Sequence, residues 1–287
     1  RQMCIRDSIS KVSKPFGRDA EMHDTSFGWR FINPKLDALY GTDGMGTTAE
    51  NLVDLHGISR EDQDRFAAGS QSKAAKAREA GHFKEEIIPV SIPRRKQDDL
   101  VFAEDEFIKP ASTPDILSKL RPAFRKEGGS VTAGNSSGLN DGACALLLAN
   151  QAGMERHGLS PLAEIVTSAV VGVEPRIMGI GPVEASRQAL TKAGLTLEDM
   201  DHIELNEAFA AQSLACTRSL GLADDDPRIN PQGGAIALGH PLGMTGARIL
   251  LTAARQLKRN GGRHALVTLC IGVGQGYATI LRNPDAA

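Results

Sequence analysis

The sequence is poor in the features that mark membrane, exported and zinc-binding proteins. Among its 287 residues, no apolar run approaches the ~18–20 residues of a membrane span, and the N-terminus lacks the charged-then-apolar layout of a signal peptide. Its four cysteines stand far apart, without a Cys-x-x-Cys pair or a Cys/His cluster, so no metal site is predicted. We therefore expect a soluble, cytoplasmic protein with no membrane partner.

The sequence also lacks an excess of either charge, with 33 Lys and Arg against 35 Asp and Glu. This balance gives no argument for nucleic acid as a partner. With 41% hydrophobic residues, the chain can form a sizeable core and, at about 100–200 residues per domain, one to three domains. No short tandem repeat is present.

The chain does not begin with Met and opens inside what looks like continuing polypeptide. We expect it to be truncated at this end, with residues 1–8 (RQMCIRDS) as a segment foreign to the rest.

The composition and residue pattern of the chain change near Asp141. Residues 11–137 are polar and turn-rich, and a helix is predicted at 60–80, where Ser59 followed by Asp62 resembles a capping box. From Asp141 onward, short β-rich runs alternate with amphipathic segments, which indicates an α/β fold. The predicted strands are 143–149, 163–171, 202–205, 264–270 and 275–281, and the predicted helices are 183–193, 207–220 and 246–259, stopped near Gly194, Gly221 and Gly261.

Reactive side chains follow strands or lie among glycines in three places. The segment 206–210 (NEAFA) comes directly after an apolar strand, where ligands bind in open α/β sheets. An Asn at such a position is more often a helix cap, which is the alternative for Asn206. In 233–243 (GGAIALGHPLG), glycines allow close approach of the backbone and Pro241 stiffens the turn. His240 is therefore either a general base or electrostatic stabiliser, or an ordinary loop residue.

The third place is 270–276 (CIGVGQG), at the end of an apolar strand. Cys270 is either a small packing residue or a thiol used in acid/base or nucleophilic chemistry beside glycine N–H groups that could hold an oxyanion. A phosphate-binding loop is the alternative for these glycines, but no Lys-Ser/Thr pair follows them. A fourth stretch, 131–142 (VTAGNSSGLNDG), is too small and polar for a core element and is also consistent with an interdomain turn.

Taken in order, TAGNSSGLNDGA (132–143), NEAFAAQ (206–212), GGAIALGHPLG (233–243) and CIGVGQG (270–276) resemble the motifs of the thiolase family. The likeness covers nearly the whole chain after residue 9 and includes GTTAEN (46–51) and KLRPAF (119–124). Within the family, the segments DTSFGWRFINP (24–34), ADDDPRINP (223–231) and HPLGMTGAR (240–248) look most like 3-oxoadipyl-CoA thiolases of aromatic-acid breakdown.

The resemblance implies the thiolase fold, in which two similar α/β halves stack as a five-layer αβαβα core with an inserted loop domain. By this comparison, residues 9–138 correspond to the loop domain, 139–160 to the end of the N-terminal half and 161–287 to the C-terminal half. Most of the N-terminal half is then missing. Relatives are homodimers or homotetramers, and we expect the same of the full-length protein.

The resemblance also assigns roles to single residues. His240 matches the base that activates the nucleophilic thiol and forms part of an oxyanion hole, and Asn206 matches the residue that holds a water in that hole. Cys270 matches the cysteine that moves a proton to and from the α-carbon of acetyl-CoA or the leaving group. The Gly272 N–H matches a donor of the second oxyanion hole.

Coenzyme A and acyl-CoA are the implied substrates, with no covalently bound cofactor. Family positions along the pantetheine and adenine path are occupied by Ser137, Ala133, Phe124, Met45, Met178, Leu139, Ala208 and Phe209. Lys109 stands where many relatives carry Arg and keeps a positive charge near the nucleotide. Gly44 replaces the His of acetoacetyl-CoA thiolases, which favours a different acyl tail.

The sequence departs from the family at the nucleophile, which lies upstream of the loop domain in relatives. The neighbours of Cys4 do not match the glycine-rich nucleophile turn, and Cys144 and Cys216 fall in a predicted strand and helix, where they read as packing residues. We therefore expect this chain alone to be inactive in acyl transfer.

Three functions follow. The first is a degradative thiolase acting on 3-oxoadipyl-CoA, with an acetyl-CoA acetyltransferase or a general 3-ketoacyl-CoA thiolase as alternatives. The second is a condensing enzyme of the ketoacyl-synthase type, which would carry His in place of Cys270. The third is a CoA-binding subunit without acyl-transfer activity.

Overall fold

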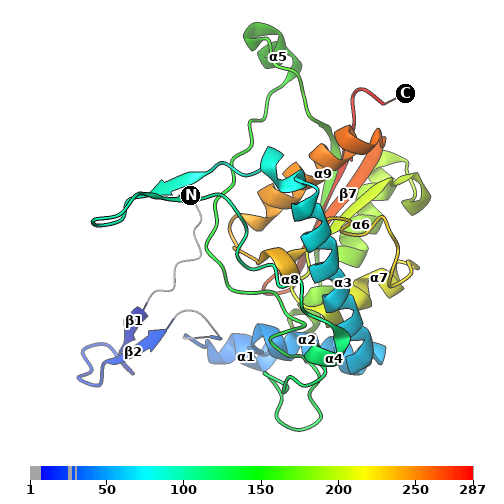
Figure 1. Ribbon diagram of the computed structural model, residues 1–287. Coiled ribbons are helices and arrows are strands. Elements are labelled where there is room, and N and C mark those ends of the chain that lie inside the picture. Colours follow the sequence, from blue (N-terminus) through cyan, green and yellow to red (C-terminus); the bar gives the residue numbers. More distant parts are fainter. Residues whose placement is uncertain (1–7, 25–27, 30, 287) are drawn as a thin grey trace.

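The computed structural model describes residues 8–24, 28–29 and 31–286, and its core is a four-stranded mixed sheet (Figure 1). The strands are β5 (Glu164–Gly172), β6 (His202–Leu205), β7 (His264–Ile271) and β8 (Gln275–Arg282), in the order β5-β8-β7-β6. β6 and β7 are parallel, whereas β8 is antiparallel to both of its neighbours. The four strands predicted between residues 163 and 281 are confirmed.

Two amphipathic helices cover the opposite faces of this sheet. Side chains alternate along a strand, so Leu266 of β7 packs with the buried alanines of α6 (Gly181–Ala193), while Val267 packs with Ile249 and Leu257 of α9 (Thr245–Asn260). The sheet and these two helices thus form one α/β/α unit. Both helices end before a glycine in the left-handed conformation, Gly194 or Gly261, as predicted.

The predicted helix at 207–220 begins later than expected, because the start of the segment has other partners. Helix α7 (Ala210–Ser219) starts after Phe209, which forms an antiparallel bridge with Ser136. The helix ends close to Gly221, as predicted: Leu220 follows its last turn, and Gly221 then has φ +79°. The loop at 135–137 therefore takes up backbone groups that the sequence pattern assigns to the first turn of a helix.

The predicted strand at 143–149 is wrong. Residues 141–150 have no regular secondary structure, and the segment leads to the isolated helix α5 (Gln151–His157) (Figure 1). In the described part of the chain no strand lies beside it, so its backbone groups have no ladder to join. Leu147 and Leu148 are 80% and 73% exposed. Cys144 consequently lies in a segment without regular secondary structure rather than in a strand.

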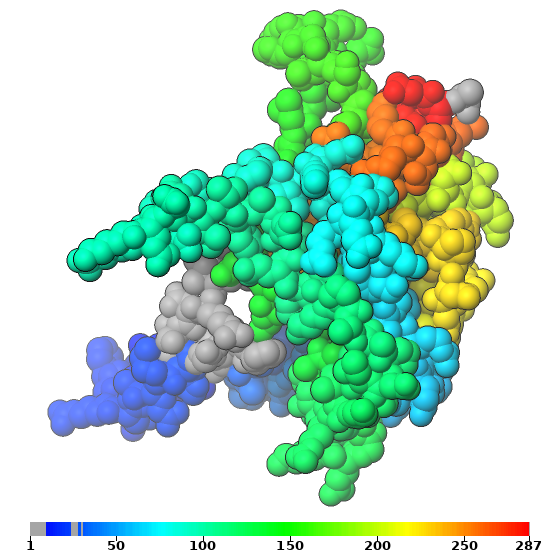
Figure 2. All heavy atoms as spheres, in the orientation of Figure 1, coloured from blue at the N-terminus to red at the C-terminus, as the bar shows by residue number. Residues whose placement is uncertain are grey.

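The N-terminal region forms an irregular cap. Its elements are β1 (Ser8–Lys11), β2 (Glu21–Asp24), α1 (Pro34–Tyr40), α2 (Met45–His56), α3 (Arg60–Glu79), η1 (His82–Glu85), β3 (Val90–Ile92), β4 (Leu100–Phe102) and α4 (Pro114–Leu117). The β1–β2 and β3–β4 hairpins project from the body as two arms (Figure 2). The remaining elements are η2 (Pro175–Ile180), η3 (Leu197–Asp199) and α8 (Ala235–Leu238).

Helix α3 confirms the predicted helix at 60–80 and joins the cap to the core. The Ser59 hydroxyl accepts a hydrogen bond from the backbone N–H of Asp62, which caps the first turn. Buried alanines on one face of α3, including Ala74, pack against Ala237 of α8. In Figure 1, α3 runs beside α7 and α8, the two elements that flank the predicted catalytic segments.

Some features predicted from the sequence lie outside the described residues. These are Cys4 with most of the 1–8 segment, and part of the 24–34 motif. Among the described helices, none is both long and apolar enough to cross a membrane. The described His, Cys, Asp and Glu side chains form no group of three that could hold a metal ion.

Candidate active site

Asn206 lies at the carboxyl end of β6, where its side chain meets His240. The parallel pairing continues past the strand, because the Asn206 N–H donates to the carbonyl of Thr268 at 3.0 Å. The Asn206 side-chain Nδ2 lies 3.4 Å from Nε2 of His240, at the long end of hydrogen-bond distances. Since α7 is capped at Phe209, the alternative role of Asn206 as a helix cap is wrong.

His240 lies in the turn between α8 and α9 and is held from both sides. Its backbone N–H donates to the carbonyl of Gly138 at 3.2 Å, and the preceding Gly239 has φ +89°, a conformation that L side chains rarely adopt. Its Nδ1 lies 2.7 Å from Oγ1 of Thr245, whose hydroxyl donates to the carbonyl of Pro241 at 3.0 Å.

These hydrogen bonds select one tautomer of the imidazole. The Thr245 proton is used on Pro241, so the threonine oxygen must accept a hydrogen from Nδ1 of His240. Nε2 then carries the lone pair and faces Asn206. Burial, assisted by the positive charge of Arg248, lowers the pKa of His240 to about 4. The imidazole is therefore neutral at pH 7 and can accept a proton.

Cys270 lies near the end of β7, on the strand that pairs with β6. It is two residues beyond Thr268, so its thiol projects to the same face of the sheet as Thr268 and Leu266, the face covered by α6. Burial raises the pKa of the Cys270 thiol to about 12, which keeps it protonated. In the described part of the chain Cys270 makes no hydrogen bond to Asn206 or His240. The parallel strands nevertheless end at the same sheet edge.

The turn from β7 to β8 is conformationally strained. Val273 has φ +68° although it is β-branched, and Gly274 has φ +89°. A Cβ on Gly274 would lie 2.2 Å from the carbonyl oxygen of Val173, and the Gly274 carbonyl accepts a hydrogen bond from the Val173 N–H at 2.8 Å. Gly272 occupies the first position of this turn, next to the end of β7.

We predict that Val273→Gly stabilises the protein, because glycine adopts this conformation without the steric cost. The free energy of unfolding, measured in urea, should rise by about 1 kcal/mol. Val170→Gly is the control, since Val170 is similarly exposed but lies in the extended strand β5, and it should lower stability. A Val273→Gly protein that is no more stable than the parent would contradict the strain.

Several of the predicted coenzyme A positions come together around the start of α7. The Ser137 N–H donates to the carbonyl of Ala208 at 3.0 Å, and the rings of Phe124 and Phe209 meet edge to face with centroids 5.9 Å apart. Leu139 follows Gly138, the residue that accepts from His240, and is 39% exposed. This group therefore lies beside the Asn206 and His240 pair.

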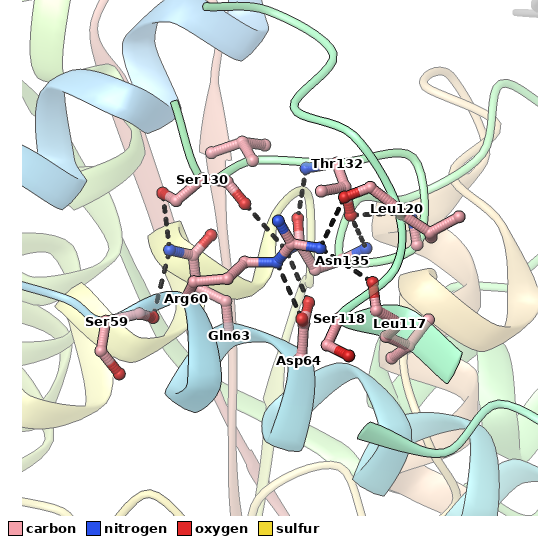
Figure 3. A network of polar contacts seen from close by, with 12 residues as sticks. Ser59, Arg60, Gln63, Asp64, Leu117, Ser118, Leu120, Ser130, Thr132 and Asn135 are labelled. Atoms are coloured by element: carbon pink, nitrogen blue, oxygen red, sulfur yellow. Dashed lines mark hydrogen bonds and ion pairs between the residues drawn. The ribbon is translucent and has the colours of Figure 1, made fainter. Parts of the chain in front are cut away.

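A buried polar network holds the segment that carries Ser137 (Figure 3). Asp64 of α3 accepts from the side chains of Arg60 and Asn135 at 2.7 and 2.9 Å, and Asn135 in turn accepts from the Thr132 N–H at 2.7 Å. Gln63 donates to the Ser130 hydroxyl at 2.9 Å. Because these contacts satisfy polar groups within the cap, they fix the loop against α3.

The other coenzyme A positions are not tied to this group by a described hydrogen bond. Met45 begins α2 and is 43% exposed, Met178 is buried in η2, and Ala133 is exposed. Lys109 is exposed, with its Nζ 4.9 Å from the centre of the Phe107 ring and its backbone N–H donating to Gln71. Its positive charge is thus free of an ion pair among the described residues.

Two residues that the sequence patterns do not single out contribute to the geometry. Thr245 follows His240 by five positions within the HPLGMTGAR segment and orients its ring. Glu207 follows Asn206 and is fully buried among hydrogen-bond donors. The sequence signal for Glu207 is its place in the NEAFAAQ motif, directly after a buried strand.

Comparison with known proteins identifies the family of this chain. The family model described as "Thiolase, N-terminal domain" matches residues 11–152, and "Thiolase, C-terminal domain" matches residues 159–283. This chain belongs to the thiolase family. The expected thiolase fold is confirmed by a solved acetyl-CoA acetyltransferase of Bacillus anthracis, which has a TM-score of 0.85 and 42% identity, over 96% of this chain and 68% of that one.

Curated thiolases are more similar still. A beta-ketoadipyl-CoA thiolase of Acinetobacter baylyi is 55% identical over 273 residues, which is 95% of this chain and 68% of the relative. A 3-oxoadipyl-CoA/3-oxo-5,6-dehydrosuberyl-CoA thiolase of Escherichia coli is 54% identical over the same shares.

Proposed function

We propose that this thiolase cleaves a 3-ketoacyl-CoA with coenzyme A, or runs the reverse condensation, using His240, Asn206 and Cys270. The observation that carries the proposal is the Asn206–His240 contact, with a neutral imidazole whose Nδ1 is engaged by Thr245. Nε2 is left as the basic atom at the sheet edge where β7 and its Cys270 also end. The favoured substrate is 3-oxoadipyl-CoA, which would give succinyl-CoA and acetyl-CoA.

The first chemical step is attack of a thiolate on the 3-keto carbon. His240 is suited to take the proton of that thiol at Nε2, and the resulting imidazolium can then donate to the developing oxyanion. Asn206 supports this role, because its Oδ1 is buried and has no partner among the described residues, as expected of a group that holds a water. The Gly272 N–H is the proposed donor of a second oxyanion hole.

The second step releases acetyl-CoA as a carbanion that needs a proton. Cys270 is suited to supply it, because its thiol stays protonated at neutral pH. A second coenzyme A then takes the acyl group from the nucleophile in a ping-pong sequence. The other two cysteines among the described residues are poorly suited to be the nucleophile. Burial raises the pKa of Cys216 and of Cys144, so neither thiol readily forms the reactive thiolate.

The coenzyme itself is proposed to lie along the group formed by Ser137, Ala208, Phe124 and Phe209. The two rings offer an apolar wall, and the backbone pairing of 135–137 with 208–210 places that wall beside His240. Lys109 offers a positive charge at the cap surface that has no ion-pair partner among the described residues. The mapping of 9–138 as a loop domain and 139–160 as the end of an N-terminal half is part of this proposal.

The dicarboxylic substrate rests on the names of the relatives and on Gly44, which caps the start of α2 where acetoacetyl-CoA thiolases carry His. The test is thiolysis of 3-oxoadipyl-CoA and of acetoacetyl-CoA under matched conditions, in the protein extended upstream to the length of its relatives. We expect the higher kcat/KM with 3-oxoadipyl-CoA. A higher value with acetoacetyl-CoA would replace the assignment by an acetyl-CoA acetyltransferase.

A second candidate is a coenzyme A-binding chain without acyl transfer, favoured by the lack of a cysteine that matches the family nucleophile in the printed sequence. Calorimetric titration with coenzyme A, run beside the thiolysis assay on the 287-residue chain, separates the two. Binding without thiolysis supports the second candidate for this chain. A homodimer or homotetramer, the proposed assembly, is checked by light scattering.

A further inference from the structure

Glu207 lies directly after Asn206 and is 1% exposed. Its carboxylate occupies the junction of α3, the turn at Asn230 and the start of α8. Burying a carboxylate away from water costs much more free energy than burying a neutral group. Hydrogen-bond donors around the carboxylate offset this cost.

Each oxygen of the Glu207 carboxylate is bonded to a different part of the chain. The Ser70 hydroxyl of α3 donates to Oε2 at 2.6 Å, and the Ile236 N–H of α8 donates to the same oxygen at 3.2 Å. The Asn230 side-chain amide donates to Oε1 at 2.8 Å. Ser70 also accepts from the Gly234 N–H at 3.0 Å, which leaves its own proton for Glu207.

These contacts favour the ionised form of the carboxyl group. Ser70, Ile236 and Asn230 all donate hydrogen bonds to it, and such donors stabilise the negative charge. The nearby positive charge of Lys73, whose Nζ donates to the Ile229 carbonyl at 2.8 Å, favours the same anionic form. Burial acts in the opposite direction and outweighs these effects, so the pKa of Glu207 is raised overall.

The partners of Glu207 lead directly to both members of the catalytic pair. Asn230 accepts from the N–H of Leu205 at 2.9 Å and donates to its carbonyl at 2.8 Å, which fixes the residue before Asn206. Gly234 and Ile236 lie in the segment that ends at His240. That segment passes so close that a Cβ on Gly234 would lie 2.3 Å from the Glu207 carboxyl carbon.

We propose that Glu207 is a positioning residue of the thiolase site, holding Asn206 and His240 in the relative position that their roles require. The proposal rests on the function proposed above. The Glu207 carboxyl group holds Leu205, the residue before Asn206, through Asn230. It holds the backbone that leads to His240 through Ile236 and Ser70. Glutamine in place of Glu207 cannot do this, because its NH₂ group would face at least one of the three surrounding donors and leave that donor without an acceptor.

The test compares Glu207→Gln with the parent chain in three measurements. These are the rate at which the methyl group of acetyl-CoA takes up deuterium in D₂O, the affinity for acetyl-CoA by calorimetry, and the titration of His240 by NMR. We expect exchange to fall by about 10- to 100-fold, as for a small displacement of reacting groups. The acetyl-CoA affinity should stay within about twofold, since coenzyme A contacts are untouched. The His240 midpoint should move up toward that of free histidine.

A second pair of variants guards against a folding defect in Glu207→Gln. Ser70→Ala removes one donor to the carboxylate. It should also lower the rate of deuterium exchange, but by a smaller factor than Glu207→Gln. Ser186→Ala is the matched control, because Ser186 is also buried in a helix but its hydroxyl has no partner among the described residues. It should leave exchange and the His240 titration unchanged.

The outcomes separate the positioning role from its alternatives. Ser70→Ala and Glu207→Gln proteins that exchange at the parent rate, with an unchanged His240 titration, would overturn the proposal. Lower stability with an unchanged His240 titration in the folded state would assign Glu207 a structural role only. If the parent chain neither binds acetyl-CoA nor exchanges its protons, the proposed function fails. The His240 titration then still tests whether Glu207 orients the imidazole.

Discussion

Cys270→Ser should lower the rate of deuterium incorporation into the acetyl-CoA methyl group by about 10²–10⁴-fold, the usual contribution of a positioned acid or base. Exchange requires a group that takes the α-proton and returns a deuteron. The thiol of Cys270 has a pKa of about 12 in its buried setting, and the hydroxyl of serine is a much weaker acid. The substitution keeps the volume nearly unchanged, so packing at the end of β7 should survive.

The measurement uses mass spectrometry of acetyl-CoA after incubation in D₂O, with acetyl-CoA affinity followed in parallel. Cys216→Ser is the matched control, because Cys216 is also fully buried, on the neighbouring helix α7, and its thiol donates to the Gly179 carbonyl at 3.1 Å, a contact that serine can keep. Equal exchange by Cys270→Ser and the parent would remove Cys270 from the proton transfer.

Acidification should destabilise the protein through His240. The folded-state pKa of His240 is lowered to about 4, against 6.5 for the unperturbed side chain, so between these values the unfolded chain binds more protons than the folded one. The stability held by the neutral imidazole is complete above pH 6.5 and is lost as the pH falls toward 4. From pH 7 to pH 5, the loss from this residue is about 2 kcal/mol.

Urea unfolding of the parent and of His240→Asn at pH 7 and pH 5 measures this contribution. Other groups, including Glu86 and Asp105 whose pKa values are raised by burial, titrate in both proteins and cancel in the comparison. The variant should therefore lose about 2 kcal/mol less than the parent on acidification. If the two proteins lose the same amount of stability, the imidazole is not held neutral by the fold.

The sequence predicts those parts of the structure whose signals are local. Alternating or continuous apolar runs identify the strands that end at Asn206 and Cys270, and a serine cap with buried alanines identifies α3. The strand at 143–149 was predicted wrongly because an apolar run does not reveal whether a neighbouring strand exists to pair with it. The start of α7 was misplaced for a similar reason, since its first residues pair with a loop more than 70 positions upstream.

For the candidate site too, the sequence reveals the residues in local motifs but not their distant partners. His240, Asn206 and Cys270 stand in glycine-rich or strand-end motifs that the sequence displays, and the contact between the first two appears in the structure. Their supporting partners cannot be found by motif alone. Ser70 meets Glu207 across 137 positions, and the choice of imidazole tautomer depends on a threonine hydroxyl whose own proton is taken by Pro241.

Helix α3 is bonded into the floor of the site as well as lying above it. Gln71 donates to the Ile236 carbonyl at 3.1 Å, Lys73 holds Ile229, and Ser70 bridges Gly234 and Glu207. Lifting this helix would strip all of these groups of their partners at once, at a cost of several kcal/mol. Helix α3 is thus a fixed part of the candidate site rather than a hinged lid. Its contacts disfavour any opening of the site that would move this helix.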